Sequence, residues 1–136
     1  MIEEFNGVIY LGLYLIILIG TAYYTYSTVF QTDKFLEKYG IDQSGAFMIR
    51  FAGTFLIPVV LLMVYMLLTG ISGNWIIFVY GFLQAVTATI VGYWTVEKSH
   101  YKTNKGEKVS SEGYLAPLGF TFAWGVVIYG TSAVIY

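Results

Sequence analysis

The chain has 136 residues, the length of one domain, and 57% of them are hydrophobic while only 11% are charged. Soluble domains carry about 25% charged residues, so these numbers argue against a soluble protein. A net charge of −1 gives no general attraction to nucleic acid, and the absence of cysteine excludes disulfides, thiolate metal sites and cysteine catalysis. The composition predicts one integral membrane domain over residues 1–136, whose first partner is the lipid bilayer.

Four apolar windows are long enough to cross about 30 Å of hydrocarbon, which takes about 20 helical residues. They cover about residues 7–30, 47–69, 75–96 and 114–136. Glu3 and Glu4 stand where a cleavable signal would carry positive charge, so we expect the first window to remain in the protein. The predicted fold is all-α, a four-helix transmembrane bundle.

Between the first two windows, Phe35, Leu36 and Tyr39 recur at helical spacing among charged residues. One interpretation is a short helix at about 32–40 that lies on the membrane surface. The other is a solvated loop whose periodicity is accidental.

The second window carries three residues that could serve a ligand. Arg50 lies at its entrance, where a guanidinium either binds a phosphate or carboxylate or extends to lipid headgroups. Pro58, halfway along, frees the carbonyl of Thr54 and predicts a kink that is either a hinge or a static bend. Tyr65 is a polar group at membrane depth.

A short turn at 70–74 predicts that the second and third helices form an antiparallel hairpin. On the third helix, Gly81, Ala85, Ala88 and Gly92 share one face and predict close helix packing, within the chain or with another copy. The alternative is a thin wall beside a ligand cleft. Gln84 is an amide inside hydrocarbon, and it serves either interhelical packing or a functional interior.

Chemical motifs are few. Glu97-x-x-His100 has the spacing of two metal ligands on one helical face, but the chain has no second histidine to complete such a site. We therefore predict no metal site, no cofactor and no catalytic residues, and an enzymatic role is not expected. Pro117 falls in the first turn of the fourth helix, where proline is tolerated.

All seven basic residues lie in residues 31–50 and 97–113, that is, in or beside the two loops that join the first window to the second and the third to the fourth. Short cationic loops are retained in the cytoplasm. The pattern predicts a multi-pass protein of the cell (inner or plasma) membrane, with loops 31–46 and 97–113 cytoplasmic and both termini outside.

One stretch carries a family resemblance. The sequence KYGID at 38–42, followed by RFAGTFL at 50–56, resembles the start of the second helix in small four-helix membrane proteins of the DoxX-like group. The resemblance implies the same four-helix fold. Some members of that group are linked to quinone or thiosulfate oxidation, but nothing here matches a redox site. It therefore implies only a structural role for Arg50 and Gly53.

Two functions are compatible with these features. The first is a membrane subunit without a catalytic site, which associates with copies of itself or with a larger membrane assembly. The second is binding or transport of a small apolar or neutral molecule, such as a quinone or lipid, in a cleft lined by Gln84, Tyr65 and Pro58 and reaching toward Arg50.

Overall fold

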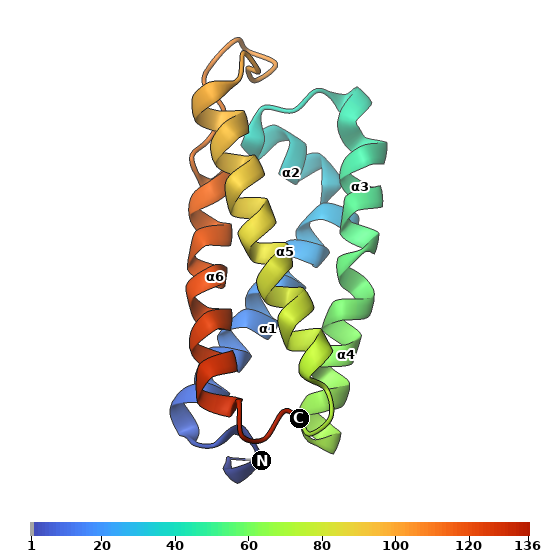
Figure 1. Ribbon diagram of the computed structural model, residues 1–136. Coiled ribbons are helices and arrows are strands. Elements are labelled where there is room, and N and C mark those ends of the chain that lie inside the picture. The colour runs from blue at the N-terminus through green and yellow to red at the C-terminus, as the bar shows by residue number, and fades with distance from the viewer. Residues whose placement is uncertain (1) are drawn as a thin grey trace.

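The computed structural model describes residues 2–136, and within them the chain is helical without strands (Figure 1). Four segments are long and apolar enough to cross a membrane, as predicted. They are α1 (Val8–Val29), α3 (Ala46–Thr54) continued by α4 (Leu56–Thr69), α5 (Trp75–Tyr93) continued by a π-helical turn (Trp94–Lys98), and α6 (Glu112–Thr131).

The outer surface of these segments is apolar. Large side chains in mid-span are widely exposed, among them Ile19 at 66%, Leu61 at 63% and Phe122 at 68%. In water such a surface would drive aggregation, whereas lipid tails solvate it. The pattern is that of a multi-pass membrane protein.

The short helix α2 (Thr32–Tyr39) forms where the sequence left a helix and a loop open. Phe35 and Leu36 are buried, and the Phe35 ring meets Tyr24 of α1 edge-on at 5.6 Å. Gly40 ends the helix with a φ of 62°, a conformation that glycine adopts without strain. The helical interpretation is therefore confirmed, and the apolar face of α2 packs inward.

The second span is broken at Phe55, between α3 and α4. Pro58 has no N–H to offer the carbonyl of Thr54, and this missing bond explains a break at that level. Just upstream, Gly53 is buried against α1, and a Cβ there would lie 2.5 Å from Thr28 Oγ1. Glycine at this position lets α3 approach α1 closely.

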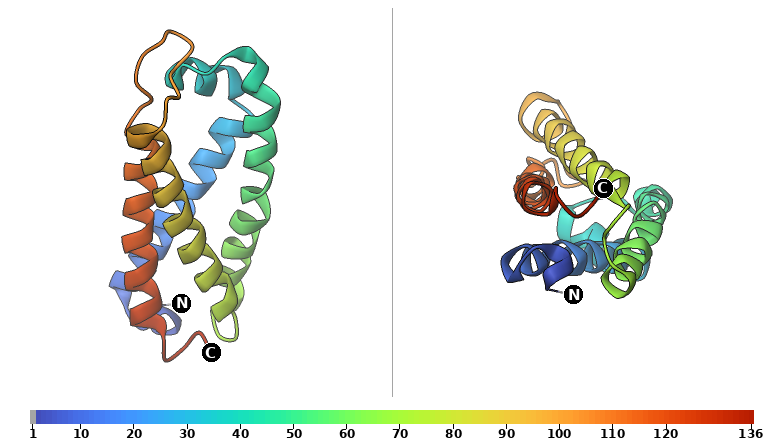
Figure 2. Two further views of the ribbon diagram at one scale, coloured as in Figure 1. Left: turned by 45° about the horizontal axis from the view of Figure 1, so that its top comes forward. Right: turned by 60° about the horizontal axis from the view of Figure 1, so that its bottom comes forward.

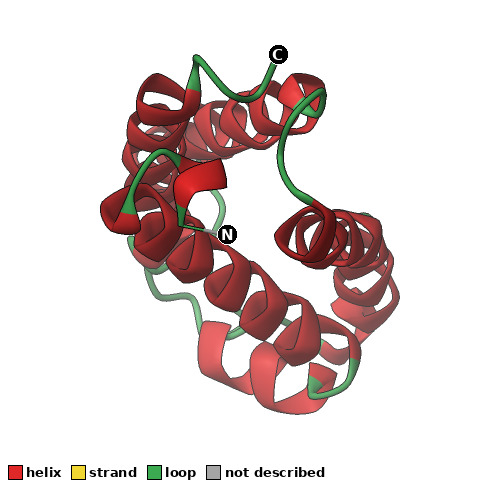
Figure 3. Cartoon of the chain, turned by 90° about the horizontal axis from the view of Figure 1, so that it is seen from below, coloured by secondary structure: helices red, strands yellow, loops and turns green. Residues whose placement is uncertain are grey.

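The spans are not packed as a compact square. α5 packs mainly on α6, and α1 packs on α6, α3 and α4, whereas α4 and α5 diverge from the turn at 70–74 that joins them (Figures 1 and 2). The predicted hairpin is thus antiparallel but splayed. Seen along the bundle in Figure 3, the spans form an arc that is open between α4 and α5.

The bundle has two different ends. Both termini lie at one end, here called the termini end; the other, the basic end, carries α2 and the loop 99–111 (Figure 1). The aromatic core lies toward the termini end, where Tyr14 contacts Phe5 at 4.8 Å and Phe78 at 6.0 Å between ring centroids. The Tyr14 hydroxyl donates to the Met63 carbonyl at 2.8 Å.

The C-terminal residues close the termini end. α6 ends at Thr131 and not at the predicted Tyr136, and the chain then turns back. The backbone N–H of Trp75 donates to the carbonyl of Ile135 at 3.1 Å, and Ile135 is buried. The first N–H groups of a helix have no partner within it, so this bond stabilises the start of α5 and explains why the last residues leave the helix.

Candidate functional site

A cavity of about 680 Å³ occupies the half of the bundle that the aromatic core leaves open. This volume is within the range of about 300–1,000 Å³ typical of small-molecule sites. Its deep wall is formed by α1, α5 and α6, and α3 and the start of α4 contribute Ile49 and Leu56. α2 and the loop 99–111 cover it at the basic end.

The cavity follows from the way α5 is held. Gly81 lies against Trp124 of α6, where a Cβ would be 2.6 Å from the indole, and Gly92 lies against the backbone carbonyl of Gly113. These two glycines bring α5 onto α6 and away from α3 and α4. Between them, Ala85 and Ala88 line the cavity and are too small to fill it.

Two polar side chains of the deep lining have no hydrogen-bond partner within residues 2–136. They are the amide of Gln84 on α5 and the hydroxyl of Thr21 on α1. The neighbouring threonines of α5 differ, because Thr87 and Thr89 donate to carbonyls of their own helix at 2.9 and 2.8 Å. Gln84 and Thr21 thus present unused hydrogen-bonding groups to the cavity.

The basic end of the cavity is held by a polar cluster. The Tyr39 hydroxyl donates to Glu112 Oε2 at 2.8 Å, and Lys38 Nζ lies 3.3 Å from the same oxygen. The backbone N–H of Asn104 donates to the Gly40 carbonyl at 2.7 Å. These contacts tie α2 to the start of α6 and to the loop 99–111.

The electrostatics of this cluster favour these contacts. Partial burial raises the pKa of Tyr39, and the hydrogen bond to Glu112 raises it further, so Tyr39 is neutral and can donate at neutral pH. Hydrogen bonds to Tyr39 and to Glu112 raise the pKa of Lys38, which stays charged. The ion pair is exposed and contributes little by itself, so the tyrosine bond and the backbone bond are the more important links.

The loop 99–111 is more ordered than its polar sequence suggests. Lys102 and Lys108 pair as an antiparallel bridge, and Lys108 Nζ lies 2.7 Å from Glu97 Oε2. The Tyr114 hydroxyl donates to Glu97 Oε1 at 3.1 Å. Both carboxylate oxygens of Glu97 are therefore bonded, one to α6 and one to the loop. The ring centroids of His100 and Tyr101 lie 4.6 Å apart. Across residues 2–136, no group of three or more His, Asp or Glu side chains is placed to hold a metal ion.

The four residues proposed as ligand contacts are not brought together. Of these, Gln84 lines the cavity. Arg50 and Pro58 are exposed on α3 and α4 and do not line it, and Tyr65 is 57% exposed on the outer surface of α4. The small-residue stripe of α5 packs on a neighbouring helix and also forms a wall of the cavity. Its glycines, Gly81 and Gly92, contact α6, and its alanines, Ala85 and Ala88, line the cavity.

Sequence reasoning missed Thr21, Tyr24, Tyr39 and Glu112 as cavity residues. Tyr24 is one of three tyrosines close together in the chain, and nothing in the sequence singles it out, while Tyr39 and Glu112 lie 73 positions apart. Thr21 carried a weak signal, because it follows Gly20 inside an apolar window and its hydroxyl is polar.

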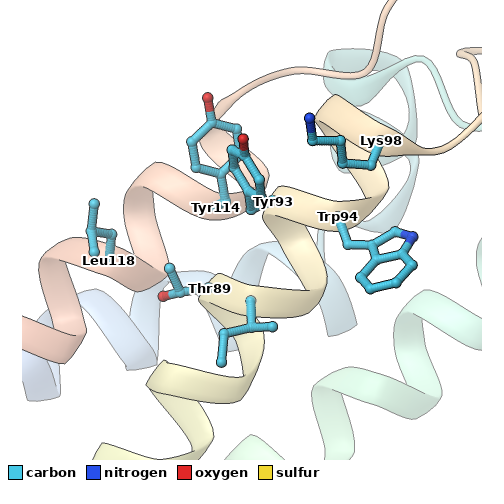
Figure 4. Close-up of a pocket in the computed structure, with 7 residues that line it drawn as sticks. Thr89, Tyr93, Trp94, Lys98, Tyr114 and Leu118 are labelled. Atoms are coloured by element: carbon cyan, nitrogen blue, oxygen red, sulfur yellow. The ribbon is translucent and has the colours of Figure 1, made fainter.

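A second, outward-facing groove of about 560 Å³ lies between α5 and α6 near the basic end (Figure 4). Tyr93 and Tyr114 meet edge-on at 5.5 Å, and their hydroxyls point the same way as the Lys98 amine in Figure 4. Trp94 and Leu118 complete its apolar part. Aromatic rings with a nearby cation are typical of a membrane interface.

Comparison with protein-family models, with curated proteins and with solved structures finds no match to this chain. The DoxX-like resemblance therefore stays a prediction, and the argument for function rests on the cavity.

Proposed function

We propose that this chain is an integral membrane protein, without a catalytic site of its own, that binds a small lipid-soluble molecule in the cavity between α1, α5 and α6. The observation that carries the proposal is the cavity of about 680 Å³. Its deep wall is formed by α1, α5 and α6, three of the segments long and apolar enough to cross a membrane, and its lining surface is mostly apolar with polar groups among it. Specific small-molecule sites have this composition.

The proposal includes an orientation. The six lysines lie in α2, at the end of the third span and in the loop 99–111, all at one end of the bundle. The positive-inside rule supports a cytoplasmic basic end and external termini. The polar, covered end of the cavity then faces the cytoplasm, and its deep part lies near the middle of the bilayer.

Native mass spectrometry of the full chain, extracted in mild detergent or in nanodiscs, tests this function. The wild-type protein is expected to retain a lipid-soluble molecule or to bind one that is added. Ala88→Phe, which fills the cavity, should reduce occupancy at least about tenfold, because the ring takes the space of the ligand. Ala52→Phe is the matched control, since Ala52 is exposed on α3 and does not line the cavity.

The helix content and thermal unfolding of both variants show whether they fold. A folded Ala88→Phe protein that retains the same molecule at wild-type occupancy would contradict the proposal. So would a wild-type protein that neither carries nor binds any lipid-soluble compound.

A role as a subunit that associates with copies of itself or with a larger assembly is the second proposal. The small-residue stripe supports it less than the sequence suggested, because α6 already occupies the glycines. The observation in its favour is a row of exposed rings along α3 and the break that follows it. Phe47 stacks on Phe51, and Phe51 meets Phe55 edge-on. The molecular mass of the protein in nanodiscs tests it, and a monomer without a co-purifying partner would count against it.

A further inference from the structure

We infer that the ligand of this cavity is a neutral, lipid-soluble molecule with a carbonyl group, which accepts a hydrogen bond from the Gln84 amide and enters from the bilayer between α5 and the α3–α4 span. This inference rests on the proposed function, and it names the class of ligand and its route.

The first step is the depth of Gln84. It lies nine positions after Trp75, the first residue of α5, and therefore about 14 Å along the helix. In a hydrocarbon layer of about 30 Å this is near the middle. Neither water nor headgroups reach that depth easily, so the amide must find its partner in protein or ligand.

The second step is that the protein does not supply the partner. Within residues 2–136 the Gln84 amide has no hydrogen bond, although it belongs to the lining of the cavity. A polar group left unpaired in hydrocarbon costs free energy. A carbonyl oxygen in the cavity would accept from the amide nitrogen, and the Thr21 hydroxyl of α1 offers a second donor in the same lining.

The third step concerns charge. The lining from α1, α5 and α6 carries two ionisable side chains, the Tyr24 phenol and Glu112 at the start of α6. The charged residues of the cavity, Asp42, Lys102 and Glu112, all lie at its basic end. Glu112 is already bonded to Tyr39 and Lys38, and Asp42 accepts from the Ser44 N–H at 2.9 Å. A charged group would thus be drawn to the basic end, whereas a neutral carbonyl suits the Gln84 level.

The fourth step is the route of entry. At the basic end, α2 and the loop 99–111 cover the cavity and are tied together at Gly40 and Asn104. On the membrane side, Leu56 and Gln84 line the same cavity from α4 and α5, two helices that diverge and do not pack along their lengths (Figures 1 and 2). Gln84 is also exposed at the surface of the bundle, which lipid covers at this depth. A ligand that enters between these helices comes from the lipid, so it must be one that dissolves there.

Binding measurements on the full-length protein in nanodiscs test the inference, with two carbonyl compounds as probes. One is a short-tailed quinone and the other dioctanoylglycerol, whose ester carbonyls offer the same acceptor. Each is paired with an analogue of equal length that lacks the carbonyl, an alkylbenzene for the quinone and a diether for the diester. The wild-type protein should prefer the carbonyl compound about tenfold, the value of one hydrogen bond at membrane depth.

Gln84→Leu keeps the bulk of the side chain and removes the amide. It should abolish the tenfold preference while leaving the affinity for the analogue unchanged. Thr87→Val on the same helix is the matched control, because Thr87 bonds to its own helix and does not line the cavity. If the protein prefers only one of the two carbonyl compounds over its analogue, that result identifies whether the ligand is a quinone or a lipid ester.

The possible failures are distinct. If Gln84→Leu binds every probe as the wild-type protein does, the assignment of the carbonyl to Gln84 is wrong while the binding function stands. The same holds if the wild-type protein binds carbonyl compounds and analogues equally. If no probe binds the wild-type protein, the inference and the proposed function both fail.

Discussion

The contact between α5 and α6 at Gly92 permits a stringent test of the fold that creates the cavity. Gly92 lies against the Gly113 carbonyl oxygen, and an added Cβ would also lie 3.0 Å from the Gly113 carbonyl carbon and 3.2 Å from Tyr114 Cα. These are backbone atoms, which cannot rotate away as a side chain can. Gly92→Ala should therefore force the two helices apart.

Two effects of this substitution oppose each other. Alanine in a helix interior is favoured over glycine by about 0.5–1 kcal/mol, whereas overpacking costs about 1–3 kcal/mol. Gly119 of α6 provides the control, because a Cβ there has nothing within 4 Å. Gly119→Ala should gain the propensity term alone, so the difference between the two variants is the packing cost, about 1–3 kcal/mol.

The assay is reversible unfolding of each variant by sodium dodecyl sulfate in mixed micelles, followed by circular dichroism. Gly12→Ala on α1, where a Cβ also has open space, serves as a second control. The expected order of stability places Gly92→Ala below the wild-type protein and both controls at or above it. Equal stability of Gly92→Ala and Gly119→Ala would refute the close α5–α6 contact.

Three further predictions concern the basic end, the cavity and the orientation. Tyr39→Phe removes the bond to Glu112, so amide exchange in α2 should become faster by up to about tenfold in hydrogen–deuterium exchange, and unchanged exchange would show that this bond does not hold α2. In a protein whose Trp75 and Trp94 are replaced by phenylalanine, Trp124 is the remaining tryptophan. Because Trp124 lines the cavity, a bound brominated diacylglycerol should quench its fluorescence. Ala88→Phe, which fills the cavity, should prevent this quenching. Alkaline phosphatase fused to the C-terminus should be active in a bacterial host, since the positive-inside rule places the termini outside; an inactive fusion that becomes active when moved into the loop 99–111 would reverse the orientation.

The spans could be predicted because their signal is local. About 20 apolar residues in a row suffice to predict a membrane helix, and the break near Pro58 follows from a missing N–H. The end of α6 at Thr131 could not be predicted in this way, because the sequence stays largely apolar beyond that residue. The chain leaves the helix there because Ile135 is buried and its carbonyl meets the Trp75 N–H, a contact between distant residues.

The cavity was predictable only in part. Gln84 attracted attention through its own chemistry, since an amide in hydrocarbon needs a partner. Arg50 attracted attention as the single arginine at a helix entrance, but its place on the exposed side of α3 keeps it out of the lining. Which side a residue faces depends on how the helices are arranged, and the composition of one helix does not contain that information.

The small residues of α5 connect the stability of the bundle to its proposed function. Gly81 and Gly92 hold α5 on α6, and the same face presents Ala85 and Ala88 to the cavity, with Gln84 at its edge. A helix with large side chains in this stripe would stand away from α6 and fill the space beside α1. Gly92→Ala should therefore weaken ligand binding as well as stability, because it displaces the helix that carries Gln84, whereas Gly119→Ala should leave both intact. A variant that lost stability and kept full carbonyl preference would show that the cavity does not depend on this contact.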